Sequence, residues 1–302
     1  MRRESALSQR IAVATCWLLA AGVALAAPAE PTACNTVHSR HLGQGLCRCE
    51  CTFIDAGLNN GRSLTQWPRD ALDGKHGKLP DAMRAKLSSC LAAESKATTC
   101  YYGFEGNGAW TQKLAAIENH LRATGTPAKV FTQTLFSVDS KPQMFHVDPM
   151  RDHLGSSIAL RQVTVLRSKA EQRAHPNESH YADGAPLSPS GSTRAPGVGT
   201  WRSIETPAVD AGRFLAEVVK ASGFVAAKID IEGFEFTLLP HLLFHHPRVL
   251  CSLNLAAIEW HEFIFPKKDD IERIGVPVVG ASQHLQWVLS HPMCNVSLLA
   301  WD

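Results

Sequence analysis

A glycine-rich loop at residues 55–61 holds the first side chains whose types and spacing could bind a ligand. An apolar run ends in Asp55, and Gly57 and Gly61 follow before a predicted helix. Gly57 allows a sharp turn and a close approach of the backbone to a ligand. Free amide groups at the helix start favour an anion such as a carboxylate, and Asp55 can accept hydrogen bonds from an ammonium group. The pattern favours a ligand with both charges, although strand-to-helix loops without a ligand also show it.

A second acidic residue, Glu105, ends the next predicted strand. An acid at this place in a nucleotide-binding fold accepts hydrogen bonds from ribose hydroxyls. Glu105 follows Asp55 by 50 positions, against about 20 in the usual dinucleotide-binding unit. We interpret residues 73–97 as an insertion that accounts for the difference. The spacing from Gly57 to Gly61 does not fit the G-x-G-x-x-G pattern, so we do not expect a nicotinamide-dependent oxidoreductase.

Three acids follow a third predicted strand within six residues, at Asp230, Glu232 and Glu235. Carboxylates at a strand end are costly unless they are solvated, paired or used in function. Lys228 is expected to pair with one of them. Glu235 has a simpler interpretation as well, because an acid favours the N-terminus of a helix.

Alternating strands and helices are expected to position these residues. Such a pattern predicts an α/β fold with a mostly parallel sheet covered by helices on both faces. Residues 168–200 are rich in Ser, Pro and Gly and are predicted to form a long surface loop. The expected strands are 52–54, 98–104, 129–138, 143–147, 158–166, 202–206, 225–231 and 250–260, the expected helices are 63–72, 81–94, 111–122, 210–221 and 234–244, and 281–290 and 296–301 complete the fold.

The N-terminus has the composition of an export signal. Arg2, Arg3 and Arg10 precede an apolar run that closes with the small residues around Ala26. A basic start, an apolar middle and small residues at the end predict a secretory signal peptide at residues 1–26. An uncleaved membrane anchor is the alternative. An extended arm is expected at residues 27–46, and one domain at residues 47–302.

Cysteine usage is consistent with export. Eight cysteines remain after Cys16 is removed with the signal peptide, and an even number in an exported chain suggests disulfides. The candidate pairs are Cys90 with Cys100 and Cys251 with Cys294. The one-residue gaps of the CRCEC sequence at residues 47–51 differ from zinc-knuckle spacing. The sequons beginning at Asn177 and Asn295 can be glycosylated in a lumenal compartment.

The charge balance limits the partners that we expect. The chain has 30 Lys and Arg against 28 Asp and Glu, with no block of like charge. A nucleic-acid surface normally requires a basic patch. We therefore expect no nucleic-acid partner, and no membrane contact beyond the possible N-terminal anchor.

Several of these motifs together resemble one known family. The sequences FIDAGLNNG at 53–61, FEGN at 104–107, GSS at 155–157, KIDIEGFE at 228–235 and IEWHE at 258–262 are similar, in this order, to motifs of the FkbM-type methyltransferases. The resemblance covers roughly residues 51–262. The KIDIEGFE string is its most specific part, and the glycine loop alone is not specific.

The resemblance implies a Rossmann-like, seven-stranded, mostly parallel sheet and methyl transfer from S-adenosylmethionine, usually to a hydroxyl oxygen. It also implies that the cofactor contacts Asp55, Gly57, Asn59 and Glu105, and that Asp230 and Glu232 lie at its methyl end. The neighbouring Asn60 and Gly61 are included in the expected cofactor-binding loop. Leu58 departs from the family, which commonly has a small residue there, and is expected to tighten the cofactor pocket.

The expected reaction is O-methylation of a hydroxyl on a glycan or small metabolite in the secretory pathway. A base that removes the hydroxyl proton would accelerate it by about 10²–10⁴-fold. Asp230 is the first candidate for this base, followed by Glu232 and His261. No metal is expected, although Asp230 and Glu259 offer an alternative metal site. Two other functions remain open: an inactive methyltransferase-like binding protein, and a glycan-processing enzyme that uses a nucleotide sugar.

Overall fold

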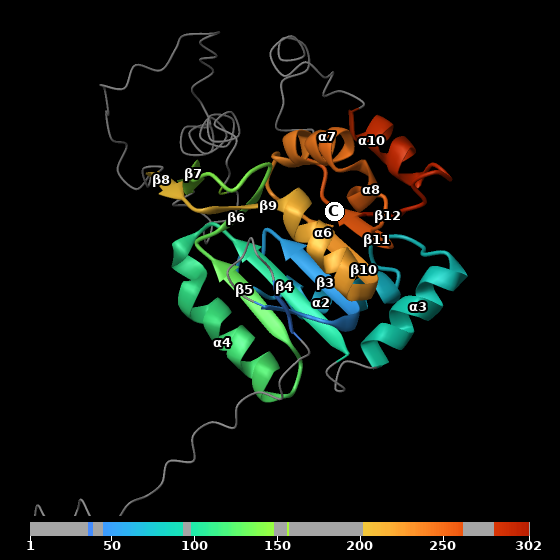
Figure 1. Cartoon of the computed structure of the whole chain (residues 1–302), viewed down its shortest axis with the longest axis horizontal. Helices are drawn as coiled ribbons and strands as arrows, with labels where there is room; N and C mark the ends of the chain where they lie inside the picture. Colours follow the sequence, from blue (N-terminus) through green and yellow to red (C-terminus); the bar gives the residue numbers. More distant parts are fainter. Residues whose placement is uncertain are drawn as a thin grey trace, which may run out of the picture. The chain divides into compact units, whose positions relative to one another are not determined.

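A six-stranded parallel sheet forms the centre of the protein in the computed structural model, which describes residues 36–38, 45–92, 98–147, 156, 202–261 and 281–301. Every neighbouring pair of strands in it is parallel (Figure 1). Parallel strands covered on both faces are usually continuous apolar runs, and the strand at 222–229 fits, because its last six residues are buried. The strands are β3 (Cys49–Ala56), β4 (Thr99–Glu105), β5 (Ala128–Thr132), β10 (Ser222–Ile229), β11 (Leu255–Ile258) and β12 (Ser297–Ala300).

The strand order of this sheet is β12-β11-β10-β3-β4-β5. The chain begins in the middle at β3 and proceeds outward through β4 and β5. It then returns to the other side of β3 and proceeds outward again from β10. In sheets of this kind, ligands bind beyond the carboxyl ends of the strands where the order reverses. That point lies between β3 and β10, and Glu105 ends the strand next to β3.

Helices cover both faces of the sheet (Figure 1). Alternate residues of each strand point to opposite faces, so each strand contributes to two separate cores. One core joins Ile54 and Ala227 to α6, α7, α8 and α10. The other joins Phe53 and Ala226 to α2, α3 and α4. These helices are α2 (Ser63–Leu72), α3 (Asp81–Ala92), α4 (Thr111–Ala123), α6 (Ala211–Ala221), α7 (Glu235–His245), α8 (Pro247–Leu250) and α10 (Ala281–Ser290).

Three smaller ladders lie outside the central sheet. Two short strands, β1 and β2, pair antiparallel within the segment expected to be an arm. A parallel pair, β6 with β9, leads into α6, whose first turn is capped where the Asp210 side chain accepts from the Arg213 amide at 2.9 Å. Strands β7 and β8 pair antiparallel. The six strands are β1 (Thr36–His38), β2 (Gly45–Cys47), β6 (Leu135–Ser137), β7 (Gln143–Val147), β8 (Arg202–Thr206) and β9 (Ala208–Asp210), and a 3₁₀ turn, η2 (Gly108–Trp110), precedes α4.

The predicted α/β class, with helices on both faces of a parallel sheet, is confirmed. The described residues give six strands in the central sheet, all parallel. The single strand expected at 129–138 is wrong, because a turn at Gln133, with a φ of 51°, separates β5 from β6. The strand expected at 250–260 begins only at Leu255, after α8. The signal peptide at 1–26, the strand at 158–166 and the loop at 168–200 lie outside the described residues.

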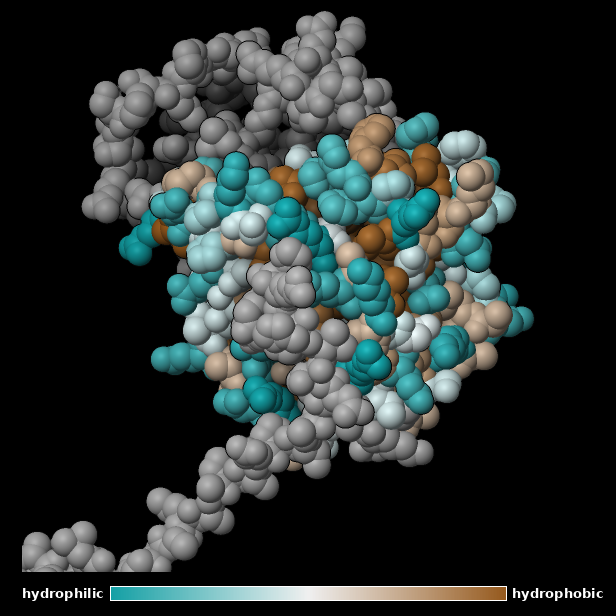
Figure 2. Space-filling model, viewed as in Figure 1, coloured by the Kyte–Doolittle hydropathy of each residue, from teal (hydrophilic) through white to brown (hydrophobic). Residues whose placement is uncertain are grey.

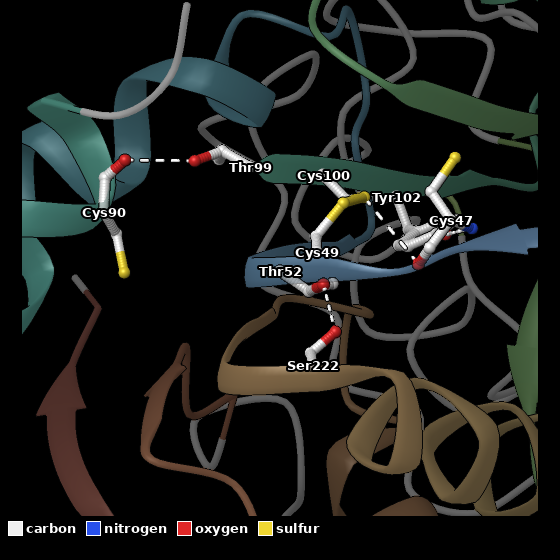
Figure 3. Close-up of a disulfide and its surroundings, with 8 residues drawn as sticks. All are labelled: Cys47, Cys49, Thr52, Cys90, Thr99, Cys100, Tyr102 and Ser222. Carbon is white, nitrogen blue, oxygen red and sulfur yellow. Dashed lines mark hydrogen bonds between the residues drawn. A yellow bond between two sulfur atoms is a disulfide. The ribbon is translucent and has the colours of Figure 1, made fainter. Parts of the chain in front are cut away.

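Disulfides join elements at the amino end of the sheet, opposite the strand ends described above (Figure 3). Cys49 of β3 is bonded to Cys100 of β4, and Cys51 of β3 is bonded to Cys90 of α3. The expected Cys90–Cys100 pair is therefore wrong. The Cys100 side chain points from β4 into the core that contains α6, whereas Cys90 lies in the core that contains α3. The sheet therefore separates the two cysteines.

The remaining cysteines of the described residues are also oxidised. The predicted bond between Cys251 and Cys294 is confirmed, and Cys47 is disulfide-bonded as well. The Cys47 amide donates to the hydroxyl of Tyr102 at 3.1 Å (Figure 3), which holds β2 against β4. Disulfides persist in oxidising compartments, in agreement with the expectation from cysteine usage.

The surface of the described residues is mostly hydrophilic in the view of Figure 2, with hydrophobic side chains showing over the region of α8 and α10. Asn295, in the second sequon, is exposed. Among the described helices, none combines the length and the hydropathy of a membrane span.

Candidate functional site

The glycine loop after β3 is fixed between the ends of its two neighbouring strands. The amides of Gly57 and Leu58 both donate to the carbonyl of Phe104 in β4, at 3.1 Å each, and the Asp230 amide donates to the carbonyl of Ala56 at 2.9 Å. Gly57 has a φ of 90°, and a Cβ on it would meet the Asp230 carbonyl. Only glycine fits this position, so the loop backbone forms the floor between the two strand ends.

Glu105 holds the same loop from the end of β4. Its Oε2 accepts from the Asn59 amide and its Oε1 from the Asn107 amide, both at 2.6 Å. Burial raises the pKa of Glu105 to about 7, although the two amide hydrogen bonds oppose the rise. Each carboxylate oxygen has two lone pairs, so both oxygens retain a position that can accept from a ligand hydroxyl.

One open cleft lies over these strand ends. Four residues predicted to contact a cofactor line it: Gly57, Asn59, Glu105 and Asp230. Glu232, a predicted catalytic residue, lines it as well. The remaining wall is mainly apolar and consists of Phe104, Gly106, Thr134, Leu135, Phe136, Phe145, Ser156 and Ile231.

Three other residues of the predicted cofactor set lie away from the lining. Asp55 is completely buried beneath the loop. The Asn60 side chain accepts from the Arg62 amide at 3.1 Å in a surface turn. A Cβ on Gly61 would meet the side chains of Leu114 and Ile117, so this glycine allows the loop to pack on α4. These residues shape and support the loop.

Leu58 does not tighten the cleft, contrary to the expectation from the sequence. Its side chain is buried in the core that contains α2 and α4 and that also includes Leu64 and Trp67. A Cβ on Gly103 would lie 2.3 Å from Leu58 Cδ1. The absence of a side chain at position 103 therefore provides the space for the larger residue at position 58.

Lys228 lies buried between two carboxylates, as the sequence suggested for one of them. Its Nζ is 2.6 Å from Asp230 Oδ2 and 3.7 Å from Asp55 Oδ1. Burial opposes the charge of Lys228, but the two acids outweigh it and raise its pKa. Burial raises the pKa of Asp55 to about 6, a rise that Lys228 and the hydroxyl of Ser63 limit. The lysine thus connects the two strand ends at the switch point.

His261, just beyond β11, lies at the centre of a second group of acids. Its Nδ1 is 3.1 Å from Oε1 of the fully buried Glu235. Its Nε2 is 3.5 Å from Glu232 Oε2, 3.5 Å from Glu259 Oε1 and 3.9 Å from Asp230 Oδ1. The third and last predicted catalytic residue therefore lies beside the other two.

The crowding of this group changes its protonation. Burial lowers the pKa of His261, but the hydrogen bond to Glu235 and the charges of nearby carboxylates raise it to about 9. Burial and the charge of Asp230 raise the pKa of Glu259 to about 8. The ring is therefore protonated at neutral pH, which makes it a weak general base, while Asp230 and Glu232 face the cleft.

Several residues of the site carry little or no signal in the sequence. The pattern around Glu235 indicates a helix N-terminal acid, yet its side chain also binds the Ile231 amide at 2.8 Å and the His261 ring. The sequence indicates Glu259 only as a ligand of the alternative metal site. The apolar wall from β6 and β7 is not predicted, because short apolar strands carry no signal for ligand contact. Ser156 belongs to the quoted GSS motif, which is the available signal for it.

A second hollow lies between α8 and α10. It is lined largely by apolar atoms, and Trp287 and Met293 are exposed at its edge, the latter by 91%. Cys251 and Cys294, which are joined by a disulfide, also line it. It contains no carboxylate and one imidazole, His291, among the described residues that line it, so it lacks paired acid and base groups. The cleft over the strand ends is the better candidate for chemistry.

Comparison with known proteins does not identify the function of this site. No family model, no curated protein and no solved structure matches the chain.

Proposed function

We propose that this protein is an S-adenosylmethionine-dependent methyltransferase that methylates a hydroxyl on a glycan or small metabolite. The observation that carries the proposal is the order of strands β10, β3 and β4, which places Asp230, the glycine loop and Glu105 around one cleft at the switch point. This is where open α/β sheets bind nucleotide-like ligands. The proposal also draws on the resemblance of the chain to FkbM-type methyltransferases.

The lining of the cleft fits a nucleoside with a charged amino-acid end. Glu105 offers its remaining lone pairs to ribose hydroxyls. Phe104, Phe136 and Phe145 provide an apolar wall suited to the flat face of a base. Gly57 leaves its side of the cleft open because it has no side chain, and Asp230 and Glu232 lie toward the other end. These residues would hold the cofactor.

The chemistry requires alignment more than activation. S-adenosylmethionine, when bound, supplies an electrophilic methyl group. The protein must place a hydroxyl oxygen in line with that methyl and take up the hydroxyl proton. Asp230 remains the first candidate for the base, with Glu232 next. Lys228 fixes the position of Asp230 through a 2.6 Å ion pair.

A secretory location is part of the proposal. It is supported by the oxidised state of the seven cysteines at positions 47, 49, 51, 90, 100, 251 and 294, because structural disulfides are rare in reducing compartments. The basic and apolar N-terminus supports it as well.

Calorimetry with S-adenosylhomocysteine tests the proposal. The purified chain should give saturable heat with one site, and Glu105→Gln should weaken binding by about fivefold, since one hydrogen bond to a ligand hydroxyl is worth about 1 kcal/mol. Glu118→Gln is the matched control, because Glu118 is a half-buried acid in α4, paired with Arg122 and Lys129 away from the cleft. The control should bind like the wild type.

The same titration separates the alternatives. A folded chain that gives no heat with S-adenosylhomocysteine would exclude the proposed cofactor and favour a binding protein. Heat with a nucleotide sugar in its place would favour a glycan-processing enzyme. If binding is established, labelled S-adenosylmethionine incubated with glycan or lysate extracts would identify the methyl acceptor.

A further inference from the structure

Three side chains at the ends of β10 and β11 place metal-binding atoms around one point. They are Asp230, Glu259 and His261, and their ligand atoms all lie within 4.8 Å of one another. His261 Nε2 is 3.5 Å from Glu259 Oε1 and 3.9 Å from Asp230 Oδ1. Nitrogen and oxygen ligands bind Zn²⁺ at about 2.0–2.2 Å, so two ligands on one ion lie roughly 3.0–3.5 Å apart. The separation of His261 Nε2 from Glu259 Oε1 already matches this spacing, and its separation from Asp230 Oδ1 exceeds it by about 0.4 Å.

A buried carboxylate orients the imidazole of this group. Glu235 is fully buried and its Oε1 lies 3.1 Å from His261 Nδ1. That contact leaves Nε2 facing the carboxylates of Asp230, Glu232 and Glu259, and a metal ion that binds there would displace the Nε2 proton. Metal-binding histidines almost always use the second ring nitrogen in this way, since the carboxylate fixes the ring and raises its basicity. Glu235 thus adds the supporting contact that a metal site requires.

The charge of the neighbourhood also favours a cation. Asp55, Asp230, Glu232, Glu235 and Glu259 gather around two basic groups of the described residues, Lys228 and His261. Glu235 Oε2 is buried and has no hydrogen-bond partner among the described residues. Two of the five, Asp55 and Glu235, are fully buried, and buried carboxylates in excess of their positive partners are costly. A divalent ion would offset this excess directly.

We propose that Asp230, Glu259 and His261 bind a divalent transition-metal cation, with Glu232 close enough to act as a further ligand. One imidazole with two or three carboxylates suits Mn²⁺, Fe²⁺ or Zn²⁺ better than Mg²⁺ or Ca²⁺, which prefer oxygen ligands alone. Lys228 does not block the site, because it contacts Oδ2 of Asp230 while Oδ1 faces His261.

The position of this site gives it a connection to the cleft. Asp230 and Glu232 line the cleft and also face His261, so a cation would lie at the cleft's acidic end. There it would contact an acceptor hydroxyl, if the proposed methyl transfer is correct, and Glu232 rather than the metal-bound Asp230 would then take up the hydroxyl proton. Cation binding itself does not depend on that function.

Titration of the chelator-treated full chain with MnCl₂, followed by the electron paramagnetic resonance signal of free Mn²⁺, tests the site. One Mn²⁺ should bind per chain, and ZnCl₂ should displace it. Glu259→Gln should weaken binding by at least about tenfold, because a carboxyl that loses its proton and becomes charged when the ion binds is replaced by a neutral amide of equal size. His261→Gln should do the same. No S-adenosylmethionine or acceptor is present, so failure of the proposed methyl transfer would leave this result unaffected.

Glu118→Gln provides the control, because it makes the same chemical change in α4, outside the group. It should retain wild-type Mn²⁺ binding, and circular dichroism should show that all variants are folded. A folded wild-type chain that binds neither Mn²⁺ nor Zn²⁺ at one ion per chain would overturn the proposal. Equal affinities of Glu259→Gln and Glu118→Gln would overturn it as well.

Discussion

The Cα of Gly57 lies against the main-chain oxygen of Asp230, so closely that a Cβ built on residue 57 would stand 1.7 Å from that oxygen. The two residues end the strands on either side of the switch point. Their backbones therefore touch directly, and the hydrogen bond from the Asp230 amide to Ala56 fixes the contact. The shape of the candidate cleft depends on this approach.

Substitution of Gly57 by alanine should separate the two strand ends. The new Cβ meets main-chain atoms, which cannot move aside as a flexible side chain can, and the φ of 90° adds backbone strain. We expect a loss of at least about 3 kcal/mol in the free energy of unfolding, measured in urea. Gly125→Ala is the control, because Gly125 has a φ of 83° and a Cβ added to it would have nothing within 4 Å; it should cost only about 1–2 kcal/mol. Equal costs would contradict the close contact.

Stability should depend on pH through Glu105. The pKa of this carboxyl is raised from 4.5 to about 7 in the folded chain, so the folded state holds the proton more tightly than the unfolded state. Proton binding by Glu105 therefore adds to the free energy of unfolding below pH 4.5. This stabilisation, roughly 3 kcal/mol in total, is lost as the pH rises through about 7. Urea unfolding between pH 5 and 8 should show a shallower decline for Glu105→Gln than for the wild type. Asp73→Asn, a change away from the cleft, should follow the wild type.

Lys228→Met should be strongly destabilising, because it leaves the fully buried Asp55 without its cation. Removal of one partner of a buried ion pair lowers the free energy of unfolding by about 3–5 kcal/mol. Asp55→Asn in the same chain should recover more than half of that loss, since the neutral amide no longer needs the lysine. The double-mutant cycle, measured in urea, checks the coupling. A double variant as unstable as the sum of the single variants would contradict the pair.

Replacing Cys51 and Cys90 together by serine should lower stability without changing ligand affinity. The bond closes a sequence separation of 39 residues, for which the chain-entropy estimate gives about 4 kcal/mol. Its cysteines lie near the amino end of the sheet and the cleft lies at the carboxyl end, so binding of S-adenosylhomocysteine should be retained. Peptide mapping of the unreduced wild type should find the Cys51–Cys90 link. A Cys90–Cys100 link would refute the connectivity.

The local elements are largely predictable from the sequence. The helix at Ser63–Leu72 and the strands at Gln143–Val147 and Arg202–Thr206 have the bounds that their patterns predict. These patterns depend on residues a few positions apart, which the sequence displays directly. The places where Asp55, Glu105 and Asp230 end strands can be predicted for the same reason. The break between β5 and β6 at Gln133 cannot be predicted from the sequence, because a positive φ at a non-glycine residue has no strong local signal.

The role of each side chain within the site was decided by the tertiary structure. Asp55 and Asp230 have the same local pattern, an acid at the end of an apolar strand, yet one is buried against Lys228 and the other lines the cleft. Likewise, nothing near Glu235 in the sequence shows that its carboxylate binds His261, 26 positions away.

The sequence by itself determined the α/β class, most of the elements and the acids at the strand ends. The tertiary structure decided the strand order, the disulfide partner of Cys90 and the meeting of Asp230, Glu259 and His261. The physical reason is that periodicity and turn preference act between neighbours along the chain. Strand pairing, burial and ion pairing join residues far apart in it, and depend on the packing of the whole fold.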